Sequence, residues 1–215
     1  MSNERPRRGL MLVLSSPSGV GKTSLSRRLV ADHHDLHLSI SMTTRAPRPG
    51  EHHGREYIFV SDADFDAEIK AGGFLEWAEV HRHHRSGTPR TPVMSALADG
   101  RDVMFDVDWQ GARALAVAAP EDTVRVFILP PSMAEMVRRI RARAGDSEEM
   151  IQRRLETARE EFTKWGEYDY VIVNDDFDHA YAELAHIYHA ERLRRQRNPW
   201  LADFVAGLQS QSGGN

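Results

Sequence analysis

The amino-acid sequence predicts an α/β fold with a mainly parallel sheet flanked by helices. Short apolar runs alternate with stretches of helical periodicity along most of the chain. The first apolar run leads through a glycine-rich turn directly into a helical stretch. Between about residues 36 and 98 this alternation gives way to short strands and turns, which indicates a lobe inserted into the core.

The first half of the chain begins with a strand, a turn and a helix. Residues 10–15 are apolar and end in serine, as in a buried strand, and residues 22–31 carry Leu25, Leu29 and Val30 at helical spacing. Polar and apolar residues then alternate over 36–43, which favours another strand. The remaining elements expected in the inserted stretch are strands at 57–60 and 74–80 and a helix at 62–71.

The second half returns to the alternation of strands and helices. Strands are predicted at 102–107, 123–129 and 170–173, and helices at 132–143, 148–165 and 177–197. The prolines at 130 and 131 end a strand, and Ser132 can cap the helix that follows. The core would thus comprise about residues 9–35, 100–130 and 168–197, with a partly disordered tail at 198–215, because residues 209–215 are polar and rich in glycine.

The composition is ordinary for a globular protein, at 215 residues with 40% hydrophobic and 28% charged residues. The net charge of -4 gives no indication of a nucleic-acid partner, and no apolar run approaches the roughly 20 residues that span a bilayer. The chain has no cysteine and no secretion signal, so the cytoplasm is the expected location. The apolar stripe of the helix at 177–197 favours core packing, and a homo-oligomer stays possible.

A phosphate-binding loop is indicated directly after the first strand. The motif G-x-x-x-x-G-K-[ST] is matched at every fixed position except the first, where serine replaces glycine. The segment consists of Ser16, Pro17, Ser18, Gly19, Val20, Gly21, Lys22 and Thr23. Glycines let backbone N–H groups surround phosphate oxygens, Lys22 would reach the β- and γ-phosphates, and Thr23 would offer a hydroxyl to Mg²⁺. The preceding strand and following helix argue against a chance glycine-rich turn.

A candidate metal neighbour follows a second buried strand. Asp106 and Asp108 come at the end of the apolar run 102–107, and a carboxylate in this place commonly lies near the metal of a phosphate-binding loop. We expect Asp106 to lie near Mg²⁺ and to act through water, since Mg²⁺ keeps several of its waters. An acidic turn at the end of a strand is the alternative interpretation.

The inserted stretch carries groups suited to a phosphate monoester and to a base. Arg45 and Arg48 are stiffened by neighbouring prolines, and Tyr57 can add a hydroxyl donor. Glu76 places a carboxylate inside an apolar run, where a buried carboxylate needs partners. The N1–H and N2–H donors of guanine would supply them, whereas adenine and cytosine lack that donor pair.

With these motifs in place, the sequence resembles the guanylate kinases over about residues 9–197. The matching segments are 15–23, 43–51, 54–60, 74–80, 106–111, 127–132, 146–149 and 168–176. The resemblance implies a P-loop kinase core with a GMP-binding lobe at about 36–98 and a helical lid at about 138–160. It also implies the reaction ATP + GMP → ADP + GDP with Mg²⁺, and dGMP is expected as a second acceptor.

The resemblance also implies roles for individual residues. The residues implied for GMP are Ser41, Arg45, Arg48, Tyr57, Glu76, Thr88, Asp106 and Asp108. Glu76 would read guanine N1 and N2, and Thr88 would contact O6. The residues implied for ATP are those of 16–23 together with Arg143, Asn174 and Asp175. Those implied for catalysis are Lys22, Arg45, Arg143 and Arg154, and those for the metal are Thr23 and Asp106.

One stretch departs from the family. Residues 81–88 are one residue longer than expected and lack two adjacent tyrosines, one of which binds the GMP phosphate. Our hypothesis is that Arg85 or His84 replaces the missing donor. The histidines of this stretch also suggest a metal site, but an exposed polar loop is favoured, since there is no cysteine and no helical histidine pair.

Two other functions are alternatives to a guanylate kinase. A non-catalytic interaction module could use a similar domain, but the intact residues of the phosphate loop argue against it. A kinase of another phosphorylated small molecule, such as a ribose bisphosphate, could share the scaffold. Glu76 and Thr88 favour guanine instead.

Overall fold

The computed structural model describes residues 6–80, 84–142 and 147–212, and it contains the predicted parallel sheet. This five-stranded sheet has the order β2-β7-β1-β8-β9, with every neighbouring pair parallel. Its strands are β1 (Met11–Ser15), β2 (Leu36–Leu38), β7 (Asp102–Asp106), β8 (Thr123–Leu129) and β9 (Tyr170–Val173). The central β1 is completely buried, because helices cover the sheet on both sides.

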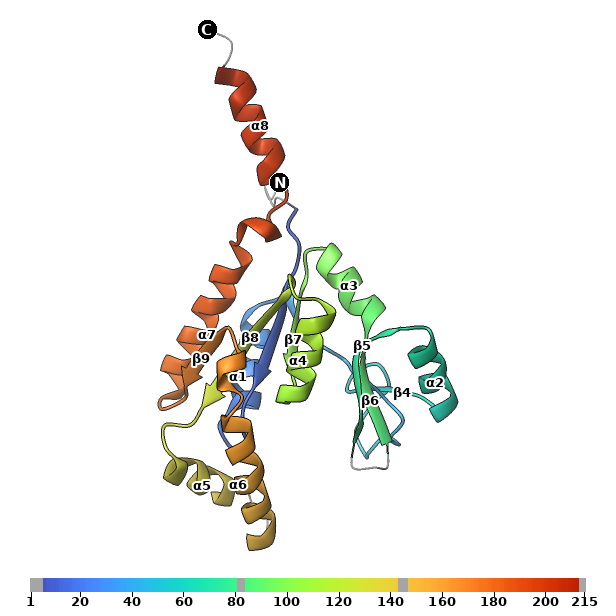
Figure 1. The fold of residues 1–215 in the computed structure, drawn as a ribbon, viewed down its shortest axis with the longest axis vertical. Helices are drawn as coiled ribbons and strands as arrows, with labels where there is room; N and C mark the ends of the chain where they lie inside the picture. The colour runs from blue at the N-terminus through green and yellow to red at the C-terminus, as the bar shows by residue number, and fades with distance from the viewer. Residues whose placement is uncertain (1–5, 81–83, 143–146, 213–215) are drawn as a thin grey trace.

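The two faces of the sheet form two hydrophobic clusters. Leu12 and Leu14 of β1 pack in the cluster that includes residues of α1 (Lys22–Asp32) and α7 (Phe177–Arg192). Met11 and Val13 point to the other face, where α3 (Arg90–Ala98) and α4 (Trp109–Ala118) lie. In α7 the predicted stripe is core packing, since Ala180, Leu184 and Tyr188 are fully buried. This arrangement confirms the α/β fold class with helices on both faces of a parallel sheet (Figure 1).

A second, smaller sheet stands to one side of the core (Figure 1). Its order is β4-β3-β6-β5, and its strands are β3 (Met42–Thr43), β4 (Ile58–Phe59), β5 (Phe74–Val80) and β6 (His84–Pro89). Helix α2 (Asp62–Lys70) begins with a capping box between Ser61 and Asp64. The second sheet therefore spans a shorter stretch than the predicted lobe at 36–98, because β2 pairs with β7 and α3 packs on the core sheet.

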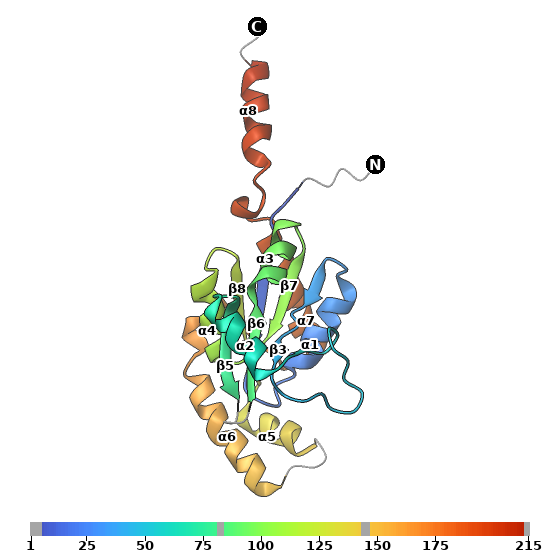
Figure 2. The same ribbon diagram turned by 90° about the vertical axis from the view of Figure 1, so that its right-hand side faces the viewer.

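Two helices extend beyond the carboxyl ends of the parallel strands. They are α5 (Met133–Ala142) and α6 (Glu148–Phe162), and both views show them at the end of the molecule opposite the terminal helix (Figures 1 and 2). The hydroxyl of Ser132 accepts from the backbone N–H of Glu135 at 3.1 Å, as predicted for a cap. A short 3-10 helix, η1 (Trp165–Glu167), leads to β9.

The structure differs from the sequence-based expectation at several elements. The stretch 36–43 splits between the two sheets as β2 and β3. Strand β6 and helices α3 and α4 were not predicted. After η2 (Arg195–Arg197), residues of the expected disordered tail form α8 (Leu201–Ser212), which projects away from the core (Figures 1 and 2). Within the described ranges, no helix has the length and apolar character needed to cross a membrane.

Candidate functional site

The glycine-rich loop joins the carboxyl end of β1 to the first turn of α1, as predicted. Gly19 and Gly21 have φ values of +83° and +100°, which residues with side chains rarely adopt. A Cβ on Gly21 would lie 2.5 Å from Nδ2 of Asn174. That Nδ2 donates to the carbonyl oxygen of Val20 at 2.6 Å, so Asn174 holds the loop from the end of β9. Asp175 does not share this contact, and its side chain is 60% exposed.

Lys22, Thr23 and Asp106 meet beside the loop. The ammonium group of Lys22 forms an ion pair with Asp106 and donates to the carbonyl oxygen of Val107 at 3.1 Å. The hydroxyl of Thr23 donates to Oδ2 of Asp106 at 3.4 Å. The adjacent parallel strands β1 and β7 explain this meeting, since both end at the same edge of the sheet. The lysine, a hydroxyl and a carboxylate thus surround one point at the start of α1.

Arginines from α5 and α6 reach back to the loop. Nη1 of Arg154 donates to the hydroxyl of Ser18 at 3.1 Å. Arg139 donates to the carbonyl oxygens of Val20 and Asn174, at 3.4 and 3.2 Å. Sequence reasoning did not assign Arg139 a firm role, because its contacts depend on how α5 packs against the loop. Arg143 lies outside the described residues.

A cavity of about 480 Å³ lies over the glycine-rich loop. Besides the loop, its lining includes Asp106, Asp108, Arg139 and Glu161. Glu161, near the end of α6, is another residue that sequence reasoning missed. Burial raises the pKa of Glu161 to about 7, while the charge of Lys22 acts in the opposite direction and Asp108 adds a smaller increase. One wall of this cavity is therefore acidic and the loop side is basic.

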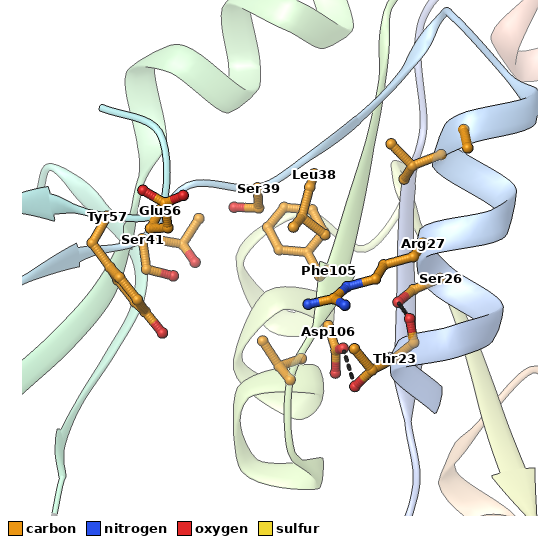
Figure 3. A pocket seen from close by; sticks show the side chains of 14 residues that line it. Thr23, Ser26, Arg27, Leu38, Ser39, Ser41, Glu56, Tyr57, Phe105 and Asp106 are labelled. Atoms are coloured by element: carbon orange, nitrogen blue, oxygen red, sulfur yellow. Dashed lines mark hydrogen bonds between the residues drawn. The ribbon is translucent and has the colours of Figure 1, made fainter. Parts of the chain in front are cut away.

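A second cavity of about 460 Å³ separates α1 from the small sheet (Figure 3). Ser41 and Tyr57 stand on the side of the small sheet, and Thr23 and Arg27 stand on α1. Asp106 lies between these two walls, and it also lines the cavity over the loop. The two cavities therefore adjoin at Asp106, next to Lys22. Arg27 is a lining residue for which sequence reasoning proposed no role.

The small sheet contributes a carboxylate and a hydroxyl from neighbouring strands. Glu76 of β5 and Thr88 of β6 are register partners, and the Thr88 hydroxyl donates to Oε1 of Glu76 at 2.6 Å. Thr88 is only 1% exposed. Burial raises the pKa of Glu76, which the hydrogen bond from Thr88 partly offsets. Glu76 faces a hollow that Ser41, Tyr57 and Asp108 also line.

Arg45 is held in place by a residue that sequence reasoning gave no role. Glu51 accepts two hydrogen bonds from Arg45, both at 3.0 Å, and a third from the backbone N–H of Arg48 at 2.7 Å. The guanidinium of Arg45 also lies 5.2 Å from the centre of the Tyr57 ring. Arg45 holds the pKa of Glu51 below its usual value. The Arg48 side chain is exposed, beside this pair.

Arg85 faces away from the cavities. It pairs with Asp62 and Asp66 of α2 and packs 5.0 Å from the centre of the Phe65 ring. Strand alternation in β6 instead directs Ser86 toward the hollow beside Glu76. The hypothesis that Arg85 supplies the missing donor is therefore not supported.

The other predicted site residues have local contacts. Asp108 caps α4 by accepting from the N–H of Gly111 at 2.8 Å, and the Ser16 hydroxyl donates to the Pro17 carbonyl at 2.9 Å. In the described part of the chain, no group of three or more His, Cys, Asp or Glu residues could hold a metal ion. The histidines at 81 and 83 lie outside it.

Comparisons with known proteins agree on one family. The family model described as guanylate kinase matches residues 8–191. The guanylate kinase of Caulobacter vibrioides is 58% identical over 206 residues, which cover 96% of each chain. That of Maricaulis maris is 56% identical over 205 residues, covering 95% of this chain and 94% of that one. The crystal structure of guanylate kinase from Anaplasma phagocytophilum matches with a TM-score of 0.73 at 33% identity, over 94% of this chain and 96% of that one.

Proposed function

Because this chain belongs to the guanylate kinase family, we propose that it transfers the γ-phosphoryl group of ATP to GMP, giving ADP and GDP. The observation that carries this proposal is the hydrogen-bonded pair of Glu76 and Thr88, which lies beside the cavities that Asp106 also lines. A kinase that phosphorylates a nucleotide needs a loop that holds the nucleoside triphosphate donor. It also needs groups that recognise the base of the acceptor. The two cavities meet at Asp106, so donor and acceptor can react there.

The loop at 16–23 would hold the phosphates of ATP. Its backbone N–H groups and the N-terminus of α1 favour negative charge, and Lys22 adds a full positive charge. On nucleotide binding, the ammonium group of Lys22 would exchange part of its contact with Asp106 for phosphate oxygens. Asn174 would act by fixing the loop through its bond to Val20.

The residues at the start of α1 fit a magnesium ion. Oxygen ligands suit Mg²⁺, and the Thr23 hydroxyl and the Asp106 carboxylate lie together, within 3.4 Å of each other. We propose that Thr23 binds the ion directly and Asp106 through water, while the phosphates of ATP supply the other ligands. When bound, Mg²⁺ neutralises charge on the transferring phosphoryl group.

Glu76 and Thr88 would recognise guanine. The Glu76 carboxylate can accept from N1–H and N2–H together, and the Thr88 hydroxyl, which donates to Glu76 in the free protein, can turn to donate to O6. Adenine presents no such donor pair on its corresponding edge. A base without these donors would leave part of the half-buried Glu76 carboxylate without a hydrogen bond, which costs free energy.

The acceptor phosphate would bind to Ser41, Arg45, Arg48 and Tyr57. Arg45 is already oriented by Glu51, so little side-chain freedom is lost when it binds. In the reaction, an oxygen of the GMP phosphate forms a bond to the γ-phosphorus. The bond from phosphorus to the bridging oxygen of ADP breaks, and ADP leaves with that electron pair.

We propose that α5 and α6 act as a lid over ATP. Arg154 already contacts the loop through Ser18, and Arg143 would join it on closure. These arginines would stabilise negative charge on the transferring group, and closure would exclude water that could otherwise hydrolyse ATP.

A coupled assay with ATP and GMP, dGMP, AMP or UMP tests the proposed function. We expect turnover with GMP and dGMP, and little with AMP or UMP. Absence of turnover with every nucleotide would contradict an enzymatic role and favour an interaction module. Turnover with a sugar phosphate in place of GMP would indicate a different acceptor.

A further inference from the structure

Arg27 lies on the α1 side of the cavity between α1 and the small sheet, which we call the acceptor cavity. It follows Thr23 by one helical turn (Figure 3). Residues four positions apart lie on the same helix face, so the side chains of Thr23 and Arg27 share this wall. The guanidinium of Arg27 extends toward the space between Phe105 and the small sheet (Figure 3). Within residues 6–80, 84–142 and 147–212, this guanidinium forms no hydrogen bond or ion pair.

The next residue in the helix, Arg28, is oriented differently. It forms ion pairs with Asp178 and Asp32, and its guanidinium lies 4.0 Å from the centre of the Tyr181 ring. Arg28 therefore ties α1 to α7 and is not among the residues that line the cavity. Two neighbouring arginines thus face different surroundings: Arg28 contacts α7, and Arg27 lines the cavity.

The charges around the cavity favour an anion near Arg27. On the opposite side, the charge of Arg45 is balanced by Glu51. Glu56 also lines the cavity, but it already accepts from Nε of Arg55 at 2.6 Å and from the N–H of His52 at 2.7 Å. Those contacts hold the pKa of Glu56 below its usual value, with the His52 N–H as the larger cause. Asp106 lines the cavity as well, but it is paired with Lys22. Among the described residues, Arg27 is therefore a cation of the cavity wall that forms an ion pair with none of these three carboxylates.

We propose that Arg27 binds the phosphate of the acceptor nucleotide from the side of the phosphate-binding loop. This assignment rests on the proposed function, and it adds a phosphate contact on α1 to those on the small sheet. A phosphate monoester carries close to two negative charges at neutral pH, and a planar guanidinium can donate two hydrogen bonds to it. Contacts from both walls would draw the walls together around the acceptor. The main competitor is an ion pair between Arg27 and Glu56 that forms when the cavity narrows.

Equilibrium binding of GMP and of guanosine to the full chain separates these roles. Guanosine keeps the base and ribose but lacks the phosphate. We expect Arg27→Ala to weaken GMP binding roughly ten- to a hundred-fold, the range for a hydrogen bond to a charged group, and to leave guanosine binding within about two-fold. Arg27→Lys keeps the charge and should recover part of the loss. Arg28→Ala is the matched control and should leave the ratio of the two affinities unchanged.

Each result decides between the roles. An equal loss for guanosine and GMP would overturn the phosphate contact, as would a GMP affinity within about two-fold of the original. If Glu56→Gln reproduced the effect of Arg27→Ala, the ion pair would be the correct assignment. Because affinities are read without turnover, a selective loss for GMP in a protein that forms no GDP would contradict the proposed reaction and leave the Arg27 contact standing.

Discussion

Glu76 and Thr88 face each other across neighbouring antiparallel strands, and a hydrogen bond of 2.6 Å joins them. The pair is set by the register of β5 and β6, not by nearness in sequence. In the small sheet, Glu76 lines the hollow beside Asp108, and Thr88 lines the adjoining cavity between α1 and the small sheet. The carboxylate and the hydroxyl are therefore paired before any base binds, and we expect recognition of guanine to need only a rotation of the Thr88 hydroxyl.

Glu76→Gln is expected to remove the recognition of guanine. The amide offers one acceptor oxygen and adds a donor that faces the N–H groups of the base. We expect kcat/KM for GMP to fall by about a hundred-fold or more, since a site built for hydrogen bonds loses that much when they cannot form. The KM for ATP should change little. Glu79→Gln alters an exposed carboxylate on the same strand and is the control. Unchanged turnover in Glu76→Gln would refute the role in reading guanine.

Gly21→Ala is expected to damage the phosphate-binding loop. The left-handed backbone alone costs about 1–2 kcal/mol for a residue with a side chain. At Gly21 the new Cβ would also press on the Asn174 amide that holds Val20. Gly54→Ala isolates the backbone cost, because Gly54 has a φ of +83° with nothing within 4 Å of its Cβ position. Denaturant unfolding should show the larger loss of stability for Gly21→Ala. Equal losses would mean that the contact with Asn174 does not matter.

Arg154→Ala is expected to slow phosphoryl transfer. Arg154 bridges α6 to Ser18, and an arginine that stabilises a transferring phosphoryl group contributes about a thousand-fold or more to kcat. Arg153→Ala provides the control, since Arg153 is exposed and pairs with Glu149 at 2.7 Å. Steady-state kinetics with saturating GMP should show a fall in kcat for Arg154→Ala only. A similar fall in both variants would point to disruption of α6 instead.

Glu161 is expected to make stability depend on pH. Burial is the largest cause of its raised pKa, from 4.5 to about 7, so between these pH values the folded chain binds more protons than the unfolded chain. Its contribution to stability is therefore present below pH 4.5 and is lost as pH rises through about 7. The Glu161→Gln variant has no ionisable group at this position, so its stability does not fall with pH in this way.

Denaturant unfolding of the nucleotide-free protein across this pH range checks the prediction. The free energy of unfolding of Glu161→Gln, relative to the original protein, should rise with pH and level off above about 7. Glu156→Gln, at an exposed position of the same helix, is the control. A difference that stays constant across the range would contradict the raised pKa.

The sequence predicted several strands with the observed bounds, but it missed α3 for a physical reason. The stretch 89–98 contains two prolines, which stiffen the chain, and no helix was predicted there. In the structure Pro89 is the N-cap of α3, and Pro92 lies in the first turn. First-turn N–H groups have no partner within the helix, so a proline there removes nothing that the helix needs. Two prolines near position 90 are thus compatible with either a loop or a helix. Packing against the core decides between the two.

Some site residues could be found from local sequence motifs, and others could not. Short motifs identified the glycine-rich loop, Asp106, Arg45 and Glu76, because each depends on the chemistry of a few adjacent residues. Arg139 and the loop contact of Asn174 depend on segments distant in the chain, Arg27 depends on the face of a helix, and Glu51 depends on how the 45–51 turn folds back on Arg45. Arg85 shows the converse, since a basic residue next to the predicted site turned out to pair with α2.

The sequence by itself determined the family and the alternation of strands and helices, and it indicated the chemical groups that we propose for a triphosphate and a guanine. These depend on local patterns that a linear chain carries in full. The tertiary structure alone decided that the cavity over the loop and the cavity between α1 and the small sheet adjoin at Asp106, and that Thr88 partners Glu76. It also decided that Arg27 lines the second of these cavities while Arg28 does not. The reason is that strand order, register and helix rotation follow from long-range packing, which couples residues far apart in the chain.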